Sequence, residues 1–202
     1  MRYLVTHSLL SSWLHTIKGN PYEDATTEKD PMEDFMHVLR REPTQTTEAM
    51  QNGIDFEDLV TAIIEGHEDQ QNPWYTEAHK IAHRCSGGIL QYKAKKPVTV
   101  AGTKLLLYGR LDCLKAGDII DIKFTKKYEA GKFISSTQHP MYMELIPEAR
   151  RFTYLISNGR ESWAESYWRE ETPDIRPIIE NFLDWLHDSD LWSEYEAHWL
   201  TQ

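Results

Sequence analysis

An acid on each of two neighbouring strands is the feature of this chain with the clearest chemical meaning. The segment GRLDCLKAGDIIDIKFT, residues 109–125, has extended apolar stretches on both sides of a short turn, which predicts a hairpin. A turn symmetric about Ala116-Gly117 makes paired positions sum to 233, which places Asp112 opposite Asp121. Like charges so placed cost a few tenths to about 1 kcal/mol unless something positive lies between them. The pair therefore predicts a site for Mg²⁺ or another divalent cation, which prefers oxygen ligands.

A lysine accompanies the two acids. Lys123 follows Asp121 by two residues, so both side chains project from the same face of the strand. Beside a bound cation, Lys123 is placed to orient or deprotonate a metal-bound water, or to neutralise charge in a transition state. The geometry depends on the turn length, because a slip of one residue puts Asp112 on the opposite face.

A third acid lies on a helix that precedes these strands. The pattern predicts a helix that begins after Thr46 or Thr47 and ends near Gly66. One stripe at helical spacing holds Met50, Ile54, Glu57, Val60, Thr61 and Ile64. Glu57 is the charged member of this apolar stripe, and acids are seldom buried without a partner. The alternative is a glutamate at the edge of the stripe with its carboxylate in water.

An amide and a phenol follow the hairpin. Gln138 and Tyr142 are four residues apart, so they share a face if a helix has begun by Gln138. Such a pair is suited to holding a phosphate or a base near the metal, although Pro140 and Pro147 restrict the helix to a short one.

In this order, the residues resemble the RecB-type branch of the PD-(D/E)XK nucleases, which includes phage exonucleases of the lambda and YqaJ type. The resemblance rests on Glu57, on Asp112, on Asp121-Ile122-Lys123 and on Gln138-x-x-x-Tyr142. The segment Glu48–Glu57 and the opening Thr6–Leu10 are also similar to motifs of that family. The similar region spans roughly residues 6–156.

The resemblance implies a site and a reaction. Asp112 and Asp121 would be metal ligands, together with the carbonyl oxygen of Ile122 and with Glu57, directly or through water. Lys123 would assist the attacking hydroxide, while Gln138 and Tyr142 would shape the site. One or two Mg²⁺ or Mn²⁺ ions would support phosphodiester hydrolysis of DNA, with linear ends as the favoured substrate.

The resemblance also implies the architecture. We expect an α/β (α+β) fold with a restriction-endonuclease-like core, a central mixed sheet flanked by helices. The whole chain, 1–202, would form one nuclease domain with its core at about 45–170. Helices at 4–16 and 33–41 and a C-terminal helical extension at about 173–202 would be added to it, and the polar stretch 18–34 would be a loop. The other strands are expected at 89–96, 97–101, 104–114, 152–157 and 161–168.

Charge is distributed unevenly. The chain has a net charge of −10, whereas residues 93–132 hold ten Lys or Arg against four acids, a net of +6. A basic middle in an acidic shell guides a polyanion to one face. The candidate DNA contacts are Arg110, Lys126, Lys127 and Lys132. The alternative is an ordinary solvated surface.

Composition narrows the remaining classes. No apolar run approaches the roughly 20 residues of a membrane span, and no convincing signal peptide is present, so a cytoplasmic location is expected. Two cysteines, Cys85 and Cys113, cannot supply the four thiolates of an iron–sulfur cluster. Candidate partners, besides DNA, are a single-strand annealing protein, a helicase on another chain, or further copies of this chain.

Two competing interpretations remain open. His79-x-x-x-His83 with Cys85 has zinc-ligand spacing but lacks a general-base glutamate, so ordinary surface histidines are favoured. The main rival from another class is a non-catalytic acidic binding protein, either a DNA mimic or a nuclease-fold scaffold. A mimic has no use for a lysine beside Asp121, and a scaffold has no use for the retained acids.

Overall fold

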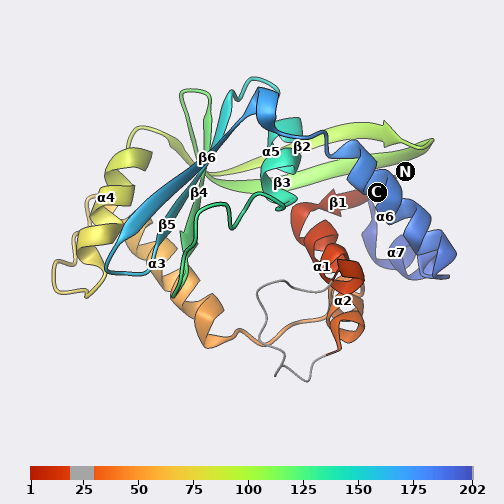
Figure 1. Ribbon diagram of the computed structural model, residues 1–202, viewed down its shortest axis with the longest axis horizontal. Helices are drawn as coiled ribbons and strands as arrows, with labels where there is room; N and C mark the ends of the chain where they lie inside the picture. Colours follow the sequence, from red (N-terminus) through yellow and green to blue (C-terminus); the bar gives the residue numbers. More distant parts are fainter. Residues whose placement is uncertain (19–29, 202) are drawn as a thin grey trace.

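The computed structural model describes residues 1–18 and 30–201 (Figure 1). The helices are α1 (His7–Lys18), α2 (Pro31–Leu39), α3 (Glu48–Ile64), α4 (Tyr75–Cys85), α5 (Gln138–Leu145), α6 (Arg176–Asp188) and α7 (Trp192–Trp199). The strands are β1 (Arg2–Thr6), β2 (Ile89–Val100), β3 (Thr103–Lys115), β4 (Asp118–Phe124), β5 (Arg151–Ser157), β6 (Ser162–Trp168) and β7 (Leu200–Thr201). Most of the predicted loop at 18–34 lies outside the described residues, and its end begins α2.

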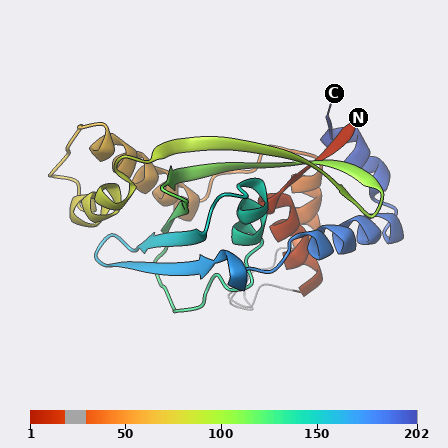
Figure 2. The same cartoon turned by 90° about the horizontal axis from the view of Figure 1, so that it is seen from above.

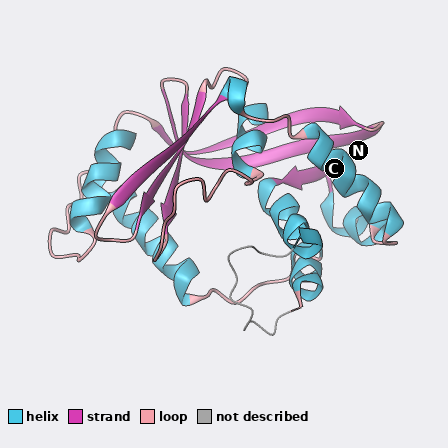
Figure 3. Cartoon of the chain, in the orientation of Figure 1, coloured by secondary structure: helices cyan, strands magenta, loops and turns pink. Residues whose placement is uncertain are grey.

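The strands form one mixed sheet in the order β6-β5-β4-β3-β1-β7, with β2 paired to β3. The pairs β1–β3 and β4–β5 are parallel, and the other pairs are antiparallel. Helices surround this sheet (Figure 3). The expected α+β fold, a mixed sheet flanked by helices, is therefore confirmed.

One strand, β3, joins the two halves of the sheet. Its hairpin partner β2 runs along one edge, from the pair Val100–Thr103 to the pair Ile89–Leu114. The other edge is shared: β1 occupies it as far as Tyr108, and β4 occupies it from Cys113 onward. Residues 109–112 therefore face neither β1 nor β4. We call this interval of the edge the β3 gap.

The predicted hairpin register is correct. The pairs Cys113–Ile120, Leu114–Ile119 and Lys115–Asp118 all sum to 233. Ala116 and Gly117 form the two-residue turn with φ of 51° and 83°, and two positive φ values are what a tight hairpin of this twist requires. Glycine adopts that conformation easily, and Ala116 carries the strain.

Hydrophobic residues form two clusters. The larger joins α1, α2, α5, α6 and α7 to the sheet and includes Leu9, Leu107, Phe152, Phe182 and Tyr195. The smaller lies between α3, α4 and the sheet and includes Phe56, Val60, Ile81, Ile120 and Leu155. Figure 1 shows α3 and α4 on one side of the molecule and α1, α2, α6 and α7 on the other, with the long β2–β3 hairpin spanning between them in Figure 2.

Several element boundaries differ from those predicted. Residues 2–6 form β1, because Tyr3 to Thr6 pair with Leu105 to Tyr108, so the helix begins only at His7. The region 89–101 is one strand rather than two, since Pro97 lies on the edge strand β2, where a missing donor is tolerated. The last helix ends at Trp199, and two residues then pair with β1. No helix in the described ranges is long and apolar enough to cross a membrane.

Candidate active site

The candidate site lies at the β3 gap. Two helices begin beside it, α1 at His7 directly after β1 and α5 at Gln138. The hydroxyl of Thr137 donates a 3.0 Å hydrogen bond to the carbonyl oxygen of His7, which ties the two helix starts together. The hydroxyl of Tyr142 donates to the carbonyl oxygen of Arg110 at 3.0 Å, so a side chain satisfies a backbone group within the gap. The end of strand pairing thus creates room for side chains from several elements.

Asp112 occupies the end of the gap nearest β4. The ladder between β3 and β4 stops at Cys113–Ile120, one pair before Asp112 and Asp121. The Oδ2 atom of Asp112 instead accepts the backbone N–H of Ile122 at 2.8 Å. The carboxylate of Asp112 therefore replaces a backbone carbonyl as the acceptor for this N–H group. Regular pairing of β3 with β4 ends before the position where Asp112 and Asp121 would be directly opposite each other.

Asp121 is the most buried acid of the group, with 3% of its surface exposed. The Nε2 group of Gln138 donates to its Oδ1 at 2.5 Å. The Nζ atom of Lys123 lies 2.8 Å from its Oδ2, within ion-pair distance. Oδ2 is buried, and Lys123 is its ion-pair partner among the described residues. Lys123 also lies over the ring of Tyr154, 6.0 Å from its centre.

Glu57 reaches the site from α3 and is held by a residue that sequence reasoning missed. The Nε2 group of Gln91 donates to Glu57 Oε1 at 2.5 Å. Gln91 lies on β2 at the register position of Asp112 and has φ of 50°, the left-handed region that non-glycine residues rarely adopt. Its Oε1 atom is buried without a partner among the described residues. No sequence motif indicates this conformation.

The acids perturb one another. Burial raises the pKa of Asp112 well above its ordinary value, and the charges of Asp121 and Glu57 raise it further. Burial also raises the pKa of Glu57, although the hydrogen bond from Gln91 and the charge of Arg110 oppose this. For Lys123, burial lowers the pKa, but the charges of Asp121, Asp112 and Glu57 outweigh burial and raise it above its ordinary value. Lys123 is therefore an ammonium ion in this arrangement.

The donor set suits a hard divalent cation. Asp112, Asp121 and Glu57 offer carboxylate oxygens, and each such oxygen has two lone pairs, so Oδ2 of Asp121 can contact Lys123 and a cation at once. In the described part of the chain, no three His, Cys, Asp or Glu side chains are close enough to form a metal cage. The acids are instead engaged by Ile122, Gln138, Lys123 and Gln91. The residues fit a cation held by one or two carboxylates plus water and substrate oxygens, as Mg²⁺ prefers.

His7 is a further residue at this site. Its ring meets the ring of Tyr142 edge-on at 5.5 Å. Burial, together with the charge of Lys123, lowers its pKa to about 4, so it is neutral at pH 7. The sequence pointed to the segment around His7 only through family resemblance, because the strand before it was missed.

Of the predicted DNA contacts, Arg110 lies within the β3 gap, and the other three follow β4 along the chain. Arg110 is exposed on β3, and its charge acts on Glu57. Lys126 and Lys127 are exposed in the loop that follows β4. Lys132 is half-buried, and its Nζ atom donates to Thr125 Oγ1 at 3.2 Å. Three of these four cations, Lys126, Lys127 and Lys132, thus belong to the loop that follows β4.

Two other sequence interpretations need correction or comment. Met50 and Ile54 are about half exposed, so the apolar stripe assigned to the helix is wrong in its first half. The buried face of α3 is formed by Phe56, Leu59, Val60 and Ile63. The histidines of the zinc alternative, His79 and His83, are exposed on α4, whereas Cys85 is buried.

No protein-family model and no curated protein matches this chain. Among solved structures, the chain is similar to the one described as "Crystal structure of SSO0001", with a TM-score of 0.57 and 11% sequence identity. The similarity covers 100% of this chain and 89% of that chain. At such low identity, the likeness concerns the fold alone, and function has to be argued from the site.

Proposed function

We propose that this protein is a metal-dependent DNA nuclease of the PD-(D/E)XK type, most simply an exonuclease that acts on linear ends. One observation supports this most strongly. A buried carboxylate, Asp121, is fixed by Gln138 on one oxygen and forms an ion pair with Lys123 through the other. The charges of Asp121 and Glu57 raise the pKa of Asp112, so the three acids interact electrostatically. Such clusters of perturbed acids around a lysine are typical of catalytic sites.

Asp112, Asp121 and the carbonyl oxygen of Ile122 would hold one or two Mg²⁺ or Mn²⁺ ions, and Glu57 would take part directly or through water. A bound ion of this kind supplies a Lewis acid and lowers the pKa of its water. The other roles belong to the chain itself. Gln138 fixes the orientation of Asp121, since its amide group donates a hydrogen bond to the Oδ1 atom of that carboxylate.

Lys123 places a positive charge where negative charge develops on the phosphate. Its ion pair with Asp121 keeps the ammonium group at the gap, and the ring of Tyr154 supports it. Tyr142 and His7 close one side of the site. Arg110, Lys126, Lys127 and Lys132 would bind the phosphate backbone, which supplies most of the affinity for DNA.

The proposal extends to the setting of the reaction. Cleavage would leave a 5′-phosphate and would serve recombination, repair or phage DNA processing in the cytoplasm. A single-strand annealing protein or a helicase would act beside this chain, and several copies could assemble around one DNA end. The net charge of −10 favours the rival hypothesis of a non-catalytic acidic protein. However, a DNA mimic has no use for a lysine held against a buried acid.

A nuclease assay tests the proposal directly. End-labelled linear DNA and closed circular DNA are incubated with Mg²⁺ or Mn²⁺, and with EDTA as control. We expect cleavage of the linear substrate alone, abolished by EDTA. Asp121→Asn and Lys123→Gln should each lower the rate at least about 100-fold, because a positioned charge or proton donor contributes that much.

Metal binding separates the two variants. Wild-type protein and Lys123→Gln should gain thermal stability on addition of Mg²⁺, since a ligand that binds only the folded state stabilises it, whereas Asp121→Asn should gain less. Lys104→Gln is the matched control and should behave as wild type, because Lys104 is exposed and lies at the start of β3, away from the β3 gap. Absence of cleavage with both metals, together with an Mg²⁺ response that Asp121→Asn leaves unchanged, would show that the proposal is wrong.

A further inference from the structure

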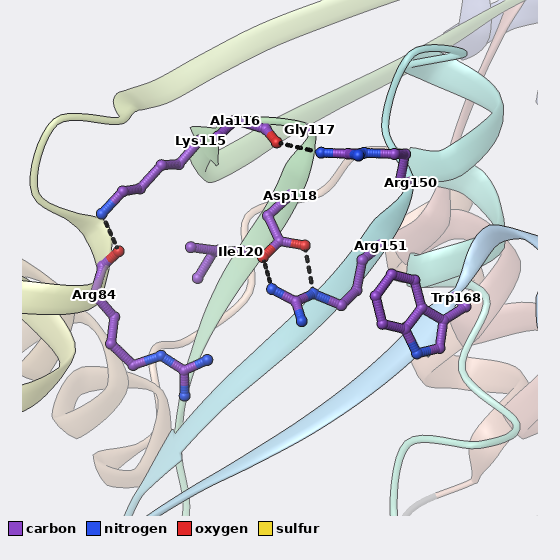
Figure 4. A pocket seen from close by; sticks show the side chains of 9 residues that line it. All are labelled: Arg84, Lys115, Ala116, Gly117, Asp118, Ile120, Arg150, Arg151 and Trp168. Atoms are coloured by element: carbon purple, nitrogen blue, oxygen red, sulfur yellow. Dashed lines mark hydrogen bonds and ion pairs between the residues drawn. The ribbon is translucent and has the colours of Figure 1, made fainter.

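A cationic pocket lies away from the candidate active site. It has a volume of about 410 Å³ and is formed where α4 ends, where β3 turns into β4, and where β5 and β6 meet (Figure 4). The side chains that matter here are Arg84, Lys115, Asp118, Arg150, Arg151 and Trp168. Ile120 also lines it, whereas Asp121, next along β4, projects from the opposite face of the sheet. Three residues of strand, about 10 Å, separate Asp118 from Asp121.

The charge in this pocket is not balanced. Asp118, the acid of its lining, is engaged by Arg151 through a two-point guanidinium–carboxylate contact. Arg84, Lys115 and Arg150 remain, and none of them forms an ion pair with an acid in residues 1–18 and 30–201. Three uncompensated cations around one cavity repel one another, so an anion placed among them is attracted. In a chain with net charge −10, such a gathering is unexpected for a random surface.

The positions of these cations are fixed by backbone contacts. The Nζ group of Lys115 donates to the carbonyl oxygen of Arg84 at 2.8 Å, which joins the end of α4 to the turn. The guanidinium of Arg150 donates to the carbonyl oxygen of Ala116 at 3.4 Å. A Cβ atom at Gly117 would lie 3.3 Å from Nε of Arg150, so glycine leaves room for the arginine to lie along the turn. Lys115 and Arg150 each keep further N–H donors that these contacts do not use. Arg84 contributes its backbone carbonyl to the contact with Lys115, so its guanidinium is not used there.

An aromatic ring completes the pocket. Trp168 at the end of β6 lines the pocket and is 44% exposed, so part of its ring is accessible to a ligand. The guanidinium of Arg151 lies 5.2 Å from the centre of its ring and holds it at the pocket. An exposed tryptophan beside arginines is the arrangement on which an unpaired base stacks while its phosphate binds the cations.

We infer that this pocket binds one nucleotide unit with an unpaired base, its phosphate held by Arg84, Lys115 and Arg150 and its base stacked on Trp168. The nucleotide is either free or part of a single strand, and the chemistry is the same for both. This inference rests on the pocket residues and does not depend on the cleavage chemistry proposed above.

Binding in EDTA tests the inference, because metal-dependent cleavage is then blocked. Fluorescence anisotropy of a labelled oligo-dT strand gives the dissociation constant over a range of salt concentrations. For Arg84→Glu/Arg150→Glu we expect binding at least about tenfold weaker, and a salt slope smaller by about 0.7, the value for one phosphate contact on a single strand. The charge-matched control Lys18→Glu/Lys104→Glu changes two exposed lysines outside the pocket and should alter binding by less than about twofold.

The tryptophan is tested with a strand that lacks bases. Trp168→Ala should weaken binding of oligo-dT about five- to a hundredfold, as loss of one stacked base does. It should leave binding of an abasic strand of the same length unchanged. Competition with dTMP separates the two sources of the nucleotide: a competitor as strong as the oligonucleotide indicates a free nucleotide, and a competitor at least about tenfold weaker indicates a strand.

If Arg84→Glu/Arg150→Glu binds oligo-dT like its control, the inference is wrong. Should that variant fail to fold, Arg84→Gln replaces it, because Arg84 is exposed and its guanidinium contacts no acid of the described chain. A protein that binds but does not cleave contradicts the proposed function alone, and one that cleaves without using this pocket contradicts the inference alone.

Discussion

His139 is buried, and no acid among the described residues is hydrogen-bonded to it. Its ring is 1% exposed, stacks on the ring of Tyr167 at 4.1 Å, and has its Nδ1 atom 3.3 Å from the hydroxyl of Tyr154. Burial lowers its pKa to about 4, and the charge of Glu165 only partly opposes this. The folded protein therefore keeps His139 neutral at pH values where the unfolded chain has already taken up a proton.

This difference predicts a loss of stability in mild acid. Above pH 6.5, the ordinary value for histidine, both states are neutral at this residue and its contribution is complete. As the pH falls from 6.5 to about 4, only the unfolded state gains the proton, so the free energy of unfolding falls by up to about 3 kcal/mol. Urea unfolding between pH 7.5 and 4.5 measures this.

His139→Gln, which cannot be protonated, should show a shallower fall over the same pH range. His7 also has a lowered pKa and remains in both proteins, so the difference between the two curves isolates His139. Parallel curves for wild type and variant would contradict the prediction.

Single residues show where sequence reasoning stops. The types and spacing of Asp112, Asp121 and Lys123 were sufficient to place them at one site, because a two-residue turn fixes the register. Gln91 could not be found, since its role depends on a left-handed backbone that arises from packing between β2, β3 and α3. Nothing in the residue type or its neighbours indicates that conformation.

At the scale of elements, the position of α5 depends on a missing side chain. A Cβ atom at Gly109 would lie 2.5 Å from Cε1 of Tyr142 and 2.9 Å from Cδ1 of Leu145. Both are buried side chains of α5 and cannot swing away. The helix that carries Gln138 therefore approaches β3 closely because residue 109 is glycine.

Gly109→Ala should push α5 away from the sheet. We expect a loss of about 1–3 kcal/mol in the free energy of unfolding, the usual cost of overpacking, measured by urea unfolding. Gly53→Ala on α3 is the matched control, because nothing lies within 4 Å of its Cβ position. That change should stabilise the protein by about 0.5–1 kcal/mol, as alanine does in a helix. Equal effects of the two substitutions would contradict this account.

The sequence predicted helices and strands correctly where neighbouring residues determine the structure. The turn at Ala116-Gly117 was placed correctly, because apolar stretches flank it on both sides. The strands at 152–157 and 161–168 were also predicted, although residues 158–161 form a four-residue loop between them and not a two-residue turn at Asn158-Gly159. The strand β1 was missed, because RYLVT runs directly into helical spacing and its partner, residues 105–108, lies a hundred positions away. Parallel pairing of that kind leaves no local trace in the sequence.

At the scale of the whole molecule, the C-terminal helices belong to the main core. Tyr195 is fully buried, and its hydroxyl donates to the carbonyl oxygen of Leu4 at 2.9 Å. The indole N–H of Trp199 donates to the carbonyl oxygen of Leu39 at 2.7 Å. The C-terminal region, which was expected to be an added extension, is thus hydrogen-bonded to both β1 and α2.

Removal of residues 189–202 should therefore be far more costly than loss of a frayed end. Loss of two buried aromatic side chains costs about 3–5 kcal/mol each, which approaches the whole stability of a typical domain. We expect no cooperative thermal transition for the truncated chain by circular dichroism. Tyr195→Phe, which removes only one hydrogen bond, should lower stability by about 1 kcal/mol. A sharp transition near the wild-type temperature for the truncated chain would refute this.

The shared edge of β3 has a consequence for how the chain can change in length. Because β1 and β4 dock on the same edge without pairing with each other, the segment 109–112 alone sets how far apart they lie. Insertion or deletion of one residue there would shift the two halves by about 3.3 Å and turn every following side chain of β3 to the other face. The segment acts as a spacer of fixed length, so we expect changes of length to be tolerated only in the turns and loops around it.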